Sequence, residues 1–254
     1  MGFLCVWLAV VAAADPVHAV AEGDSAYARR DLAAARSHYE AALAAPDSFP
    51  ALWRLARVES ELGEDARGRE QQELIGSSVL HARAAVRVAP DSAPGHEWLA
   101  VALGRKALKE GPKKKLALAR EIKSEVDRTL ALDPHSARAY HVRAIWNREL
   151  ASLNFMERMA ANTVLGGVPK GASMENAVHD LERAIELDPG NINHHLELGR
   201  TWLQLDRKDD ARRELERAVA LPPGATARDP HYQEEARALL ARLPKRSDRD
   251  TLPR

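Results

Sequence analysis

Ala89-Pro90-Asp91, Asp133-Pro134, Asp188-Pro189 and Leu221-Pro222-Pro223 are four short segments that each close an amphipathic stretch, and together they decide the fold class. Pro90 and Pro134 are 44 residues apart, Pro134 and Pro189 are 55 apart, and Pro189 and Pro223 are 34 apart. Pro46 precedes Pro90 by a further 44 residues. Because proline cannot continue a helical hydrogen-bond ladder, each segment marks the end of a helix. The nearly regular spacing therefore indicates an internal repeat.

Residues at fixed offsets support the repeat. In two units 176 residues apart, a glycine is followed after 12, 16 and 19 residues by an alanine, a large side chain and a second alanine. These residues are Gly23, Ala35, Tyr39 and Ala42 in the first unit, and Gly199, Ala211, Leu215 and Ala218 in the last. Small residues let the two helices of a pair cross closely. The pattern resembles the tetratricopeptide repeat (TPR), whose period is about 34 residues. The sequence thus predicts an all-α, TPR-like solenoid of about five helix pairs with a C-terminal capping helix.

The composition indicates an ordinary helical protein. Lys and Arg together number 37 and so do Asp and Glu, so there is no excess positive charge to bind a polyanion. Aromatic residues make up only 5% of the 254 residues, and abundant Ala, Leu, Arg and Glu favour helix over sheet. We therefore expect no nucleic-acid binding.

The N-terminus has the pattern of an export signal. Residues 3–14 form an apolar run that is too short for a membrane span of about 20 residues. Val17-His18-Ala19 offers a signal peptidase site, which predicts a leader over 1–19, and Ala12-Ala13-Ala14 is an alternative site. We therefore expect a periplasmic or secreted protein, with a cytoplasmic location as the alternative. Cleavage would remove Cys5, the single cysteine. The mature chain then consists of a TPR-like domain over 20–243 and a polar, flexible tail over 244–254.

Apolar periodicity and capping residues predict the helix boundaries. Gly63 is expected to be a left-handed C-cap, and Ser173 an N-cap. The segment 136–165 is expected to form one overlong helix, which accounts for the 55-residue interval. The predicted helices cover residues 19–30, 32–45, 49–62, 66–89, 94–109, 113–132, 136–165, 173–187, 192–205, 208–220 and 231–243.

Several stretches in the middle of the chain carry a more specific resemblance. They are Gly95-His96-Glu97-Trp98-Leu99-Ala100-Val101-Ala102-Leu103-Gly104-Arg105, Ala119-Arg120-Glu121-Ile122-Lys123, Trp146-Asn147, Ala151-Ser152-Leu153-Asn154-Phe155, and residues 166–173. With them the chain, over about residues 20–221, resembles the regulator of microtubule dynamics family, and its bacterial relatives best. The resemblance implies a TPR-like fold with an irregular fourth unit and a non-enzymatic binding role. It also implies a relationship to eukaryotic members that are associated with microtubules and organelle membranes.

The concave face of the solenoid is the first candidate site. Helical spacing from the small crossing residues places cationic, aromatic and apolar side chains on the inward stripe of the first helix of each pair. We expect partner-binding residues there at Trp53, Arg57, Glu97, Arg105, His141, Arg148 and Arg200, interleaved with Val101, Ile145 and Leu196. Arginine pairs bidentately with carboxylates, which favours an unidentified, acidic protein or peptide as the partner. The alternative is that these side chains pack against the next repeat.

A second group of candidate residues lies around the glycine-rich turn formed by residues 166–171. Asn147 and Asn154 are seven residues apart and so would share one face of the predicted long helix. Amides inside an apolar helix usually bond a neighbouring loop. We expect them to hold that loop in place, with a ligand-binding role as the alternative. The predicted loop clasp consists of Trp146, Asn147, Asn154, Phe155, Gly166, Gly167 and Pro169.

Catalytic and metal motifs are incomplete. His194 and His195 are adjacent, so on a helix they point about 100° apart and do not chelate one ion together. His96-Glu97 lacks the second histidine of a zinc protease motif, and the glycine-rich turn lacks the Walker A spacing. We therefore expect no metal, no cofactor and no enzymatic activity. The predicted function is a protein-interaction scaffold, and the alternative is a lipid or amphiphile carrier with an apolar groove between its long helices.

Overall fold

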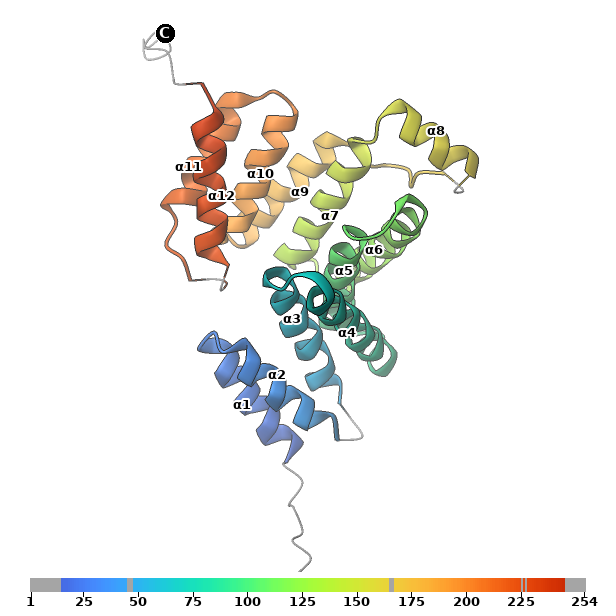
Figure 1. Cartoon of the computed structure of the whole chain (residues 1–254), viewed down its shortest axis with the longest axis vertical. Helices are drawn as coiled ribbons and strands as arrows, with labels where there is room; N and C mark the ends of the chain where they lie inside the picture. Colours follow the sequence, from blue (N-terminus) through green and yellow to red (C-terminus); the bar gives the residue numbers. More distant parts are fainter. Residues whose placement is uncertain (1–14, 45–47, 165–166, 225, 227, 245–254) are drawn as a thin grey trace, which may run out of the picture. The chain divides into compact units, whose positions relative to one another are not determined.

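The computed structural model describes residues 15–44, 48–164, 167–224, 226 and 228–244 (Figure 1). Over these residues the chain is all-α, with twelve α-helices and one short 3-10 helix. The helices are arranged in antiparallel pairs, as the repeat predicts. The chain divides into two compact units, residues 1–89 and residues 90–254, which we call unit 1 and unit 2.

Unit 1 contains two helix pairs, α1 with α2 and α3 with α4. A 3-10 turn, η1, follows α2. The helices are α1 (Pro16–Ala28), α2 (Leu32–Ala41), η1 (Ala42–Ala44), α3 (Phe49–Asp65) and α4 (Gly68–Val88).

Unit 2 contains three pairs and a capping helix. Helix α5 packs on α6, α7 on α9, and α10 on α11, while α12 covers α11 and α10. The helices are α5 (Ala93–Ala107), α6 (Pro112–Leu132), α7 (Ala137–Ala151), α8 (Phe155–Val164), α9 (Met174–Leu187), α10 (Ile192–Gln204), α11 (Lys208–Ala220) and α12 (Asp229–Arg242).

The small residues at the helix crossings have the expected role. A Cβ atom added at Gly23 would lie 2.3 Å from the ring of Tyr39, and one at Gly199 would lie 2.7 Å from Cγ of Leu215. Tyr39 and Leu215 are both fully buried. The glycine of the first helix therefore receives the large side chain of the second helix in both units, which confirms this part of the sequence prediction.

The overlong helix predicted over 136–165 is wrong, because the chain breaks after Ala151 into α7 and α8. The hydroxyl of Ser152 donates to the carbonyl of Arg148 at 2.7 Å, and Asn154 begins a new helix. Its Oδ1 accepts the Glu157 N–H at 3.0 Å, while Glu157 Oε2 accepts the Asn154 N–H at 2.8 Å. This reciprocal capping box ends one helix and starts the next, so Asn147 and Asn154 do not share a helical face.

Two predicted caps have different outcomes. Ser173 caps α9 as expected, since its Oγ accepts the Asn176 N–H at 3.0 Å. Gly63 is not a C-cap, because α3 continues to Asp65. Instead Gly63 is buried, and a Cβ there would lie 3.1 Å from the side chain of Ile75. The glycine allows α4 to pack closely on α3.

The core of each unit consists of aliphatic and alanine side chains at the helix crossings. Leu55 and Val58 of α3 pack with Tyr39 in unit 1. The fully buried Ile192, Leu196 and Leu215 belong to one cluster near the C-terminus of unit 2. Within the described residues, none of the helices combines the length and the hydrophobicity that crossing a bilayer requires.

Candidate functional site

In unit 1 the predicted partner-binding residues Trp53 and Arg57 lie on α3. The guanidinium of Arg57 stacks 3.6 Å from the centroid of the Tyr27 ring and 5.2 Å from that of Trp53. It also donates to the Tyr39 hydroxyl at 3.4 Å. The guanidinium carbon of Arg54 lies 4.2 Å from the centroid of the Trp53 ring. Arg57 therefore connects α3 to the first helix pair through two tyrosines.

Asp24 is the anion of the same cluster. It accepts two hydrogen bonds from Arg54, at 2.7 and 2.9 Å, and one from the Tyr39 hydroxyl at 2.7 Å. Burial by itself raises the pKa of Asp24, but the bonds from Arg54 and Tyr39 and the charges of Arg54 and Arg57 outweigh it, so its pKa is lowered. The carboxylate is thus held ionised between the two helix pairs.

In unit 2 Glu97 links α5 to the start of α7. Its carboxylate accepts the hydroxyl of Ser136 at 2.5 Å and Nε of Arg138 at 3.0 Å. Arg138 also stacks on the ring of Trp98, with 4.4 Å between its guanidinium carbon and the ring centroid. Glu97 therefore holds both Ser136, the N-cap of α7, and Arg138 in position.

His141 of α7 meets His194 of α10, with 2.9 Å between their Nδ1 atoms. One ring must donate and the other accept, so the two rings are not both protonated. Burial, followed by the charges of Arg148, Arg138 and Arg105, lowers the pKa of His141 to about 3. Burial and the neighbouring His141 hold the pKa of His194 well below its usual value. Both rings are therefore neutral near pH 7, and three arginine side chains lie close enough to His141 to disfavour its protonation.

Arg148 lies about two turns after His141 on α7 and is 7% exposed. Its guanidinium lies 2.7 Å from Glu197 Oε2 and donates to the Glu197 carbonyl and the Thr201 hydroxyl, both at 3.3 Å. Arg200 pairs with the other oxygen of Glu197 and, at 2.6 Å, with Glu235 of α12. This chain of charges ties α7, α10 and α12 together, as in the alternative in which the arginines pack against the next repeat.

The structure thus brings together the predicted residues of unit 2 and adds three that sequence reasoning missed. We call Glu97, Arg105, His141, Arg148 and Arg200 the unit 2 polar face. The missed residues are Arg138, His194 and Glu197. The sequence analysis considers His194 only as a metal ligand beside His195, whereas its partner is a histidine 53 positions earlier. Glu197 follows His194 by three residues and so lies on the same face of the helix, which was the signal in the sequence that the two belong to one site.

The residues of the predicted loop clasp have partners in the helices. The indole N–H of Trp146 donates to the Ala119 carbonyl at 2.7 Å, and Asn147 donates to Asp180 at 3.1 Å. Asn154 caps α8, as above. Gly166 lies outside the described residues, as does the side chain of Phe155.

Three other side chains bond the glycine-rich turn. Arg120 donates to the Gly167 carbonyl at 2.6 Å, Asn162 Oδ1 accepts the Val168 N–H at 3.2 Å, and Asn176 donates to the Gly171 carbonyl at 2.9 Å. Gly167 and Gly171 both have φ near +87°, a conformation that favours glycine. Pro169, between them, is partly buried.

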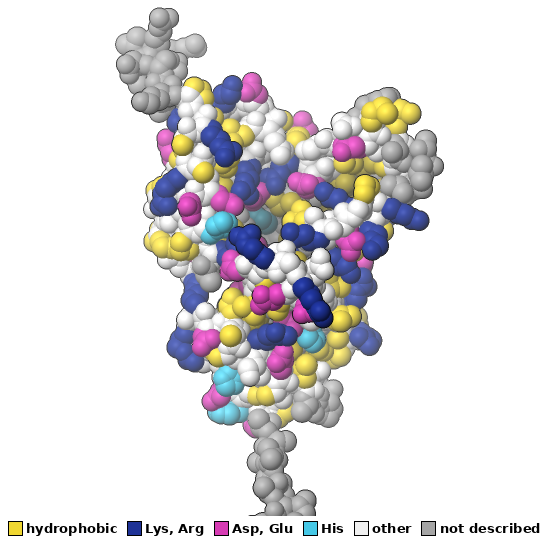
Figure 2. All heavy atoms as spheres, viewed as in Figure 1, with side chains coloured by type: hydrophobic (Ala, Val, Ile, Leu, Met, Phe, Trp, Pro, Cys, Tyr) yellow, Lys and Arg dark blue, Asp and Glu magenta, His cyan; other side chains and the backbone are white. Residues whose placement is uncertain are grey.

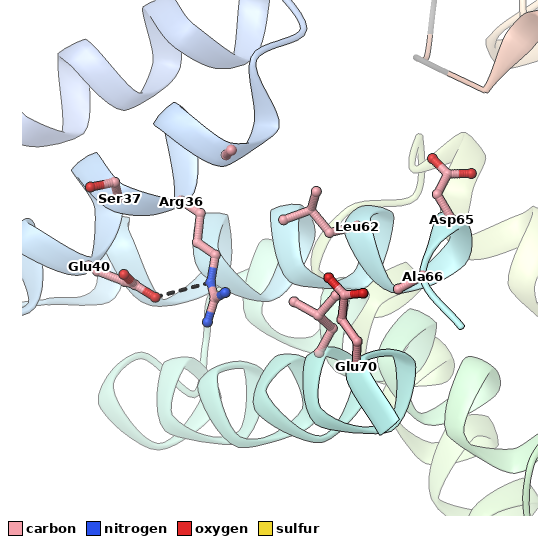
Figure 3. A pocket seen from close by; sticks show the side chains of 9 residues that line it. Arg36, Ser37, Glu40, Leu62, Asp65, Ala66 and Glu70 are labelled. Atoms are coloured by element: carbon pink, nitrogen blue, oxygen red, sulfur yellow. Dashed lines mark ion pairs between the residues drawn. The ribbon is translucent and has the colours of Figure 1, made fainter. Parts of the chain in front are cut away.

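A pocket of about 550 Å³ opens in unit 1 between α2, α3 and α4 (Figure 3). Its charged lining residues are Arg36, Glu40, Asp65 and Glu70, and its apolar ones include Leu62 and Leu74. Sequence reasoning considered only the first helix of each pair and therefore missed this site, which is formed largely by the second helices. The acidic end of α3 was the available signal.

Charges of both signs occur on one face of the surface, and the described residues offer no grouped metal ligands. On the face shown in Figure 2, basic and acidic side chains are interspersed. Among the residues that the structure describes, no three His, Cys, Asp or Glu side chains are grouped so that they could hold a metal ion.

The family model and the similar proteins of known name agree on one family. Residues 11–244 match the family model described as regulator of microtubule dynamics protein 1-3. The chain is 31% identical over 192 residues to regulator of microtubule dynamics protein 1 of Bos taurus, which covers 74% of this chain and 60% of that protein. The protein of the same name from Caenorhabditis elegans is 28% identical over 189 residues and is covered to 83%. The chain thus spans about 60% of the length of the mammalian relatives named protein 1, and 40% of those named protein 3.

Among solved structures, a thermophilic TPR protein of Thermus thermophilus superposes with a TM-score of 0.64 at 19% identity. The match covers 87% of this chain and 98% of that one. At this identity the similarity concerns the fold, and it establishes the TPR-like architecture that the proline spacing predicts.

Proposed function

This chain belongs to the regulator of microtubule dynamics protein 1-3 family, and on that basis we propose that it is a non-catalytic scaffold that binds a partner protein through the unit 2 polar face. TPR-like solenoids present long side-chain surfaces to extended partners. The motifs of the sequence supply no nucleophile and base at recognisable spacing, which favours binding over catalysis.

The three arginines close to His141 are the feature that supports the choice of partner. Burial lowers the pKa of His141 most, and the charges of Arg148, Arg138 and Arg105 lower it further. Arg138 is paired with Glu97 and Arg148 with Glu197. An anionic group placed beside His141 would be stabilised by the same three charges. We infer that the partner presents an acidic segment to α5 and α7.

A peptide-binding measurement tests this inference. The full chain is titrated into a fluorescein-labelled nonapeptide of alternating Glu and Ala, and fluorescence anisotropy gives Kd. Arg105 is the residue to change, because Arg148 is needed to neutralise Glu197. We expect Arg105→Ala to raise Kd about tenfold, as expected for loss of one charge-assisted contact. The matched control is Arg217→Ala on the exposed face of α11. Equal effects of the two substitutions would remove the polar face as the binding site.

Microtubules are the natural first partner to examine, since the relatives are named for microtubule dynamics. In a co-sedimentation assay, the proposal expects the chain to pellet with polymerised tubulin and Arg105→Ala to reduce the bound fraction. Equal bound fractions for the wild type and Arg105→Ala would place any microtubule contact outside the unit 2 polar face.

The carrier alternative requires a continuous apolar groove. The 550 Å³ pocket of unit 1 instead has four ionisable side chains in its lining, which favours the scaffold. Native mass spectrometry of gently purified protein decides between the two: stoichiometric lipid supports the carrier and its absence supports the scaffold.

A further inference from the structure

The turn between α5 and α6 concentrates positive charge in a chain whose formal net charge is zero. Residues 106–115, which we call the α5–α6 turn, contain five lysines and one glutamate. Four of these lysines are exposed: Lys109, Lys113, Lys114 and Lys115. The last three lie in the first turn of α6, where the helix dipole disfavours cations, so the stability of α6 does not account for them. The balanced composition therefore conceals a local basic surface.

Ion pairs offset only part of this charge. Lys114 lies 3.2 Å from Glu110, and Lys115 lies 3.6 Å from Glu149 of α7. Among the ion pairs of the described residues, none involves Lys109 or Lys113. The α5–α6 turn thus presents two exposed lysines whose charge the described carboxylates do not neutralise.

Large apolar side chains are exposed beside these lysines. Leu108 lies inside the α5–α6 turn itself and is 66% exposed. Met156 on α8 is 71% exposed, and Met159, three residues later on the same face of the helix, is exposed as well. Exposed apolar groups that are bordered by charges mark surfaces that bind another molecule.

Contacts on both sides of α8 place it at the same end of unit 2 as the α5–α6 turn. The pair of Lys115 and Glu149 joins the start of α6 to the last turn of α7, and α8 follows α7. After α8, the Gly167 carbonyl accepts a hydrogen bond from Arg120 of α6 at 2.6 Å. None of the described helices packs extensively on α8, and Figure 1 shows it projecting from the end of α7. Figure 2 shows apolar side chains exposed at the tip of this projection.

We propose that the α5–α6 turn and the exposed face of α8 dock this chain on an anionic membrane surface. Lysine ammonium groups would contact lipid phosphates, while Leu108 and Met156 would enter the boundary between head groups and acyl chains. A lysine stem is apolar and its end is charged, so Lys109 and Lys113 suit this boundary too. A projecting turn and a projecting helix can both touch a flat surface, whereas neither encloses a peptide. The proposal goes beyond the scaffold role and does not depend on it.

Vesicle flotation with the full chain tests the proposal. Phosphatidylcholine vesicles with about 30% phosphatidylglycerol should bind the chain at least about tenfold more tightly than vesicles of phosphatidylcholine alone. We expect Lys109→Gln/Lys113→Gln to weaken binding to the anionic vesicles by about 30-fold, because two cations near the surface are lost. Both side chains are exposed, so thermal unfolding should be unchanged.

Lys123→Gln/Lys208→Gln is the matched charge control. It removes the same net charge from unit 2, but Lys123 pairs with Asp127 and Lys208 with Asp206, outside the α5–α6 turn. It should weaken vesicle binding less than about threefold, because exposed charges far from the contact are screened by salt. Equal effects of the two double substitutions, or equal binding to both kinds of vesicle, would overturn the proposal.

A second pair of variants tests the apolar contact. Leu108→Gln should weaken binding to the anionic vesicles at least about fivefold, because a partly inserted leucine is lost. Leu80→Gln on α4 is its control, since Leu80 is 67% exposed but lies in unit 1. Equal effects of these two substitutions would contradict insertion of Leu108. If Lys109→Gln/Lys113→Gln instead weakens binding of the Glu-Ala nonapeptide and leaves vesicle binding unchanged, the turn contacts an acidic protein segment and the membrane proposal is wrong.

Discussion

Gly199 and Leu215 pack so closely that a Cβ atom on the glycine would lie 2.7 Å from Cγ of the leucine and 2.8 Å from its Cδ2. Leu215 is fully buried, and the carbonyl of Ala211 is a further 3.4 Å neighbour of the same position. The crossing of α10 and α11 therefore depends on the missing side chain. Gly23 and Tyr39 have the same relationship in unit 1.

Gly199→Ala should reduce the free energy of unfolding by about 2 kcal/mol, because an extra methyl group in a packed crossing forces the helices apart. Urea denaturation measures this. Gly104→Ala is the control: Gly104 is also inside a helix, but nothing lies within 4 Å of an added Cβ. There alanine should stabilise by about 0.5–1 kcal/mol through helix propensity. Equal destabilisation at both positions would contradict the packing argument.

The sequence predicted this crossing because packing restricts residue size at fixed offsets, and such restrictions are visible in a repeat. Helix ends were less predictable. The apolar period continues from α7 into α8, whereas the break depends on a hydrogen-bonded exchange between Asn154 and Glu157. An S-x-x-E type pattern inside a periodic segment was the signal for it.

The partners of individual side chains were even harder to predict from the sequence. Spacing assigns Arg148 to the predicted inward stripe, but its partner Glu197 is 49 residues away on another helix. Likewise His141 and His194 meet only through packing of α7 against α10. Long-range pairs of this kind need the register between helices, which a single sequence with a degenerate repeat does not define.

The pair of Arg148 and Glu197 should be a stabilising strut. Arg148→Met keeps the volume but leaves the 7%-exposed Glu197 without one of its two cations. We expect a loss of about 3 kcal/mol in the free energy of unfolding, at the lower end for a broken buried pair because Arg200 still neutralises the carboxylate. Chemical denaturation of Arg148→Met beside Arg217→Met, an exposed arginine expected to cost less than about 0.5 kcal/mol, measures the difference. Similar losses for both variants would show that the pair contributes nothing.

The neutral histidine pair should make stability depend on pH. Folding lowers the pKa of His141 to about 3, and that of His194 also falls, while the unfolded chain binds protons near pH 6.5. Between these values the unfolded state holds more protons, so stability is fully present above about pH 6.5 and declines as pH falls toward 3. The slope is about 1.4 kcal/mol per pH unit for each such histidine.

Denaturation of wild type and of His141→Asn/His194→Asn at pH 7 and pH 5 checks this dependence. The double variant should lose less stability over this interval than the wild type, whatever its stability at pH 7. His179→Asn serves as the control, because the His179 side chain is 77% exposed and its removal should leave the slope unchanged. Identical slopes for the double variant and wild type would mean that folding does not lower the pKa values of this pair.

Export of this chain remains a proposal, and the first helix constrains where a leader could be removed. Asp15 caps α1: its Oδ1 accepts the Val17 N–H at 3.1 Å, and its carbonyl accepts the Ala19 N–H at 2.9 Å. Ala19 is 4% exposed and packs with Ala42 and Ala51. Cleavage after Ala19 would remove the cap and this contact, whereas cleavage after Ala14 would keep both.

We therefore expect an exported chain to begin at Asp15, the alternative site, and not at Val20. N-terminal sequencing of protein purified from its native host gives the answer directly. As a physical control, chains that start at Asp15 and at Val20 can be compared in thermal unfolding. The longer chain should be more stable by about 1 kcal/mol or more, because an N-cap alone contributes about that much. A mature terminus at Val20, with equal stability of the two chains, would show that the first turn of α1 is dispensable and that the Val17-His18-Ala19 site is the one used.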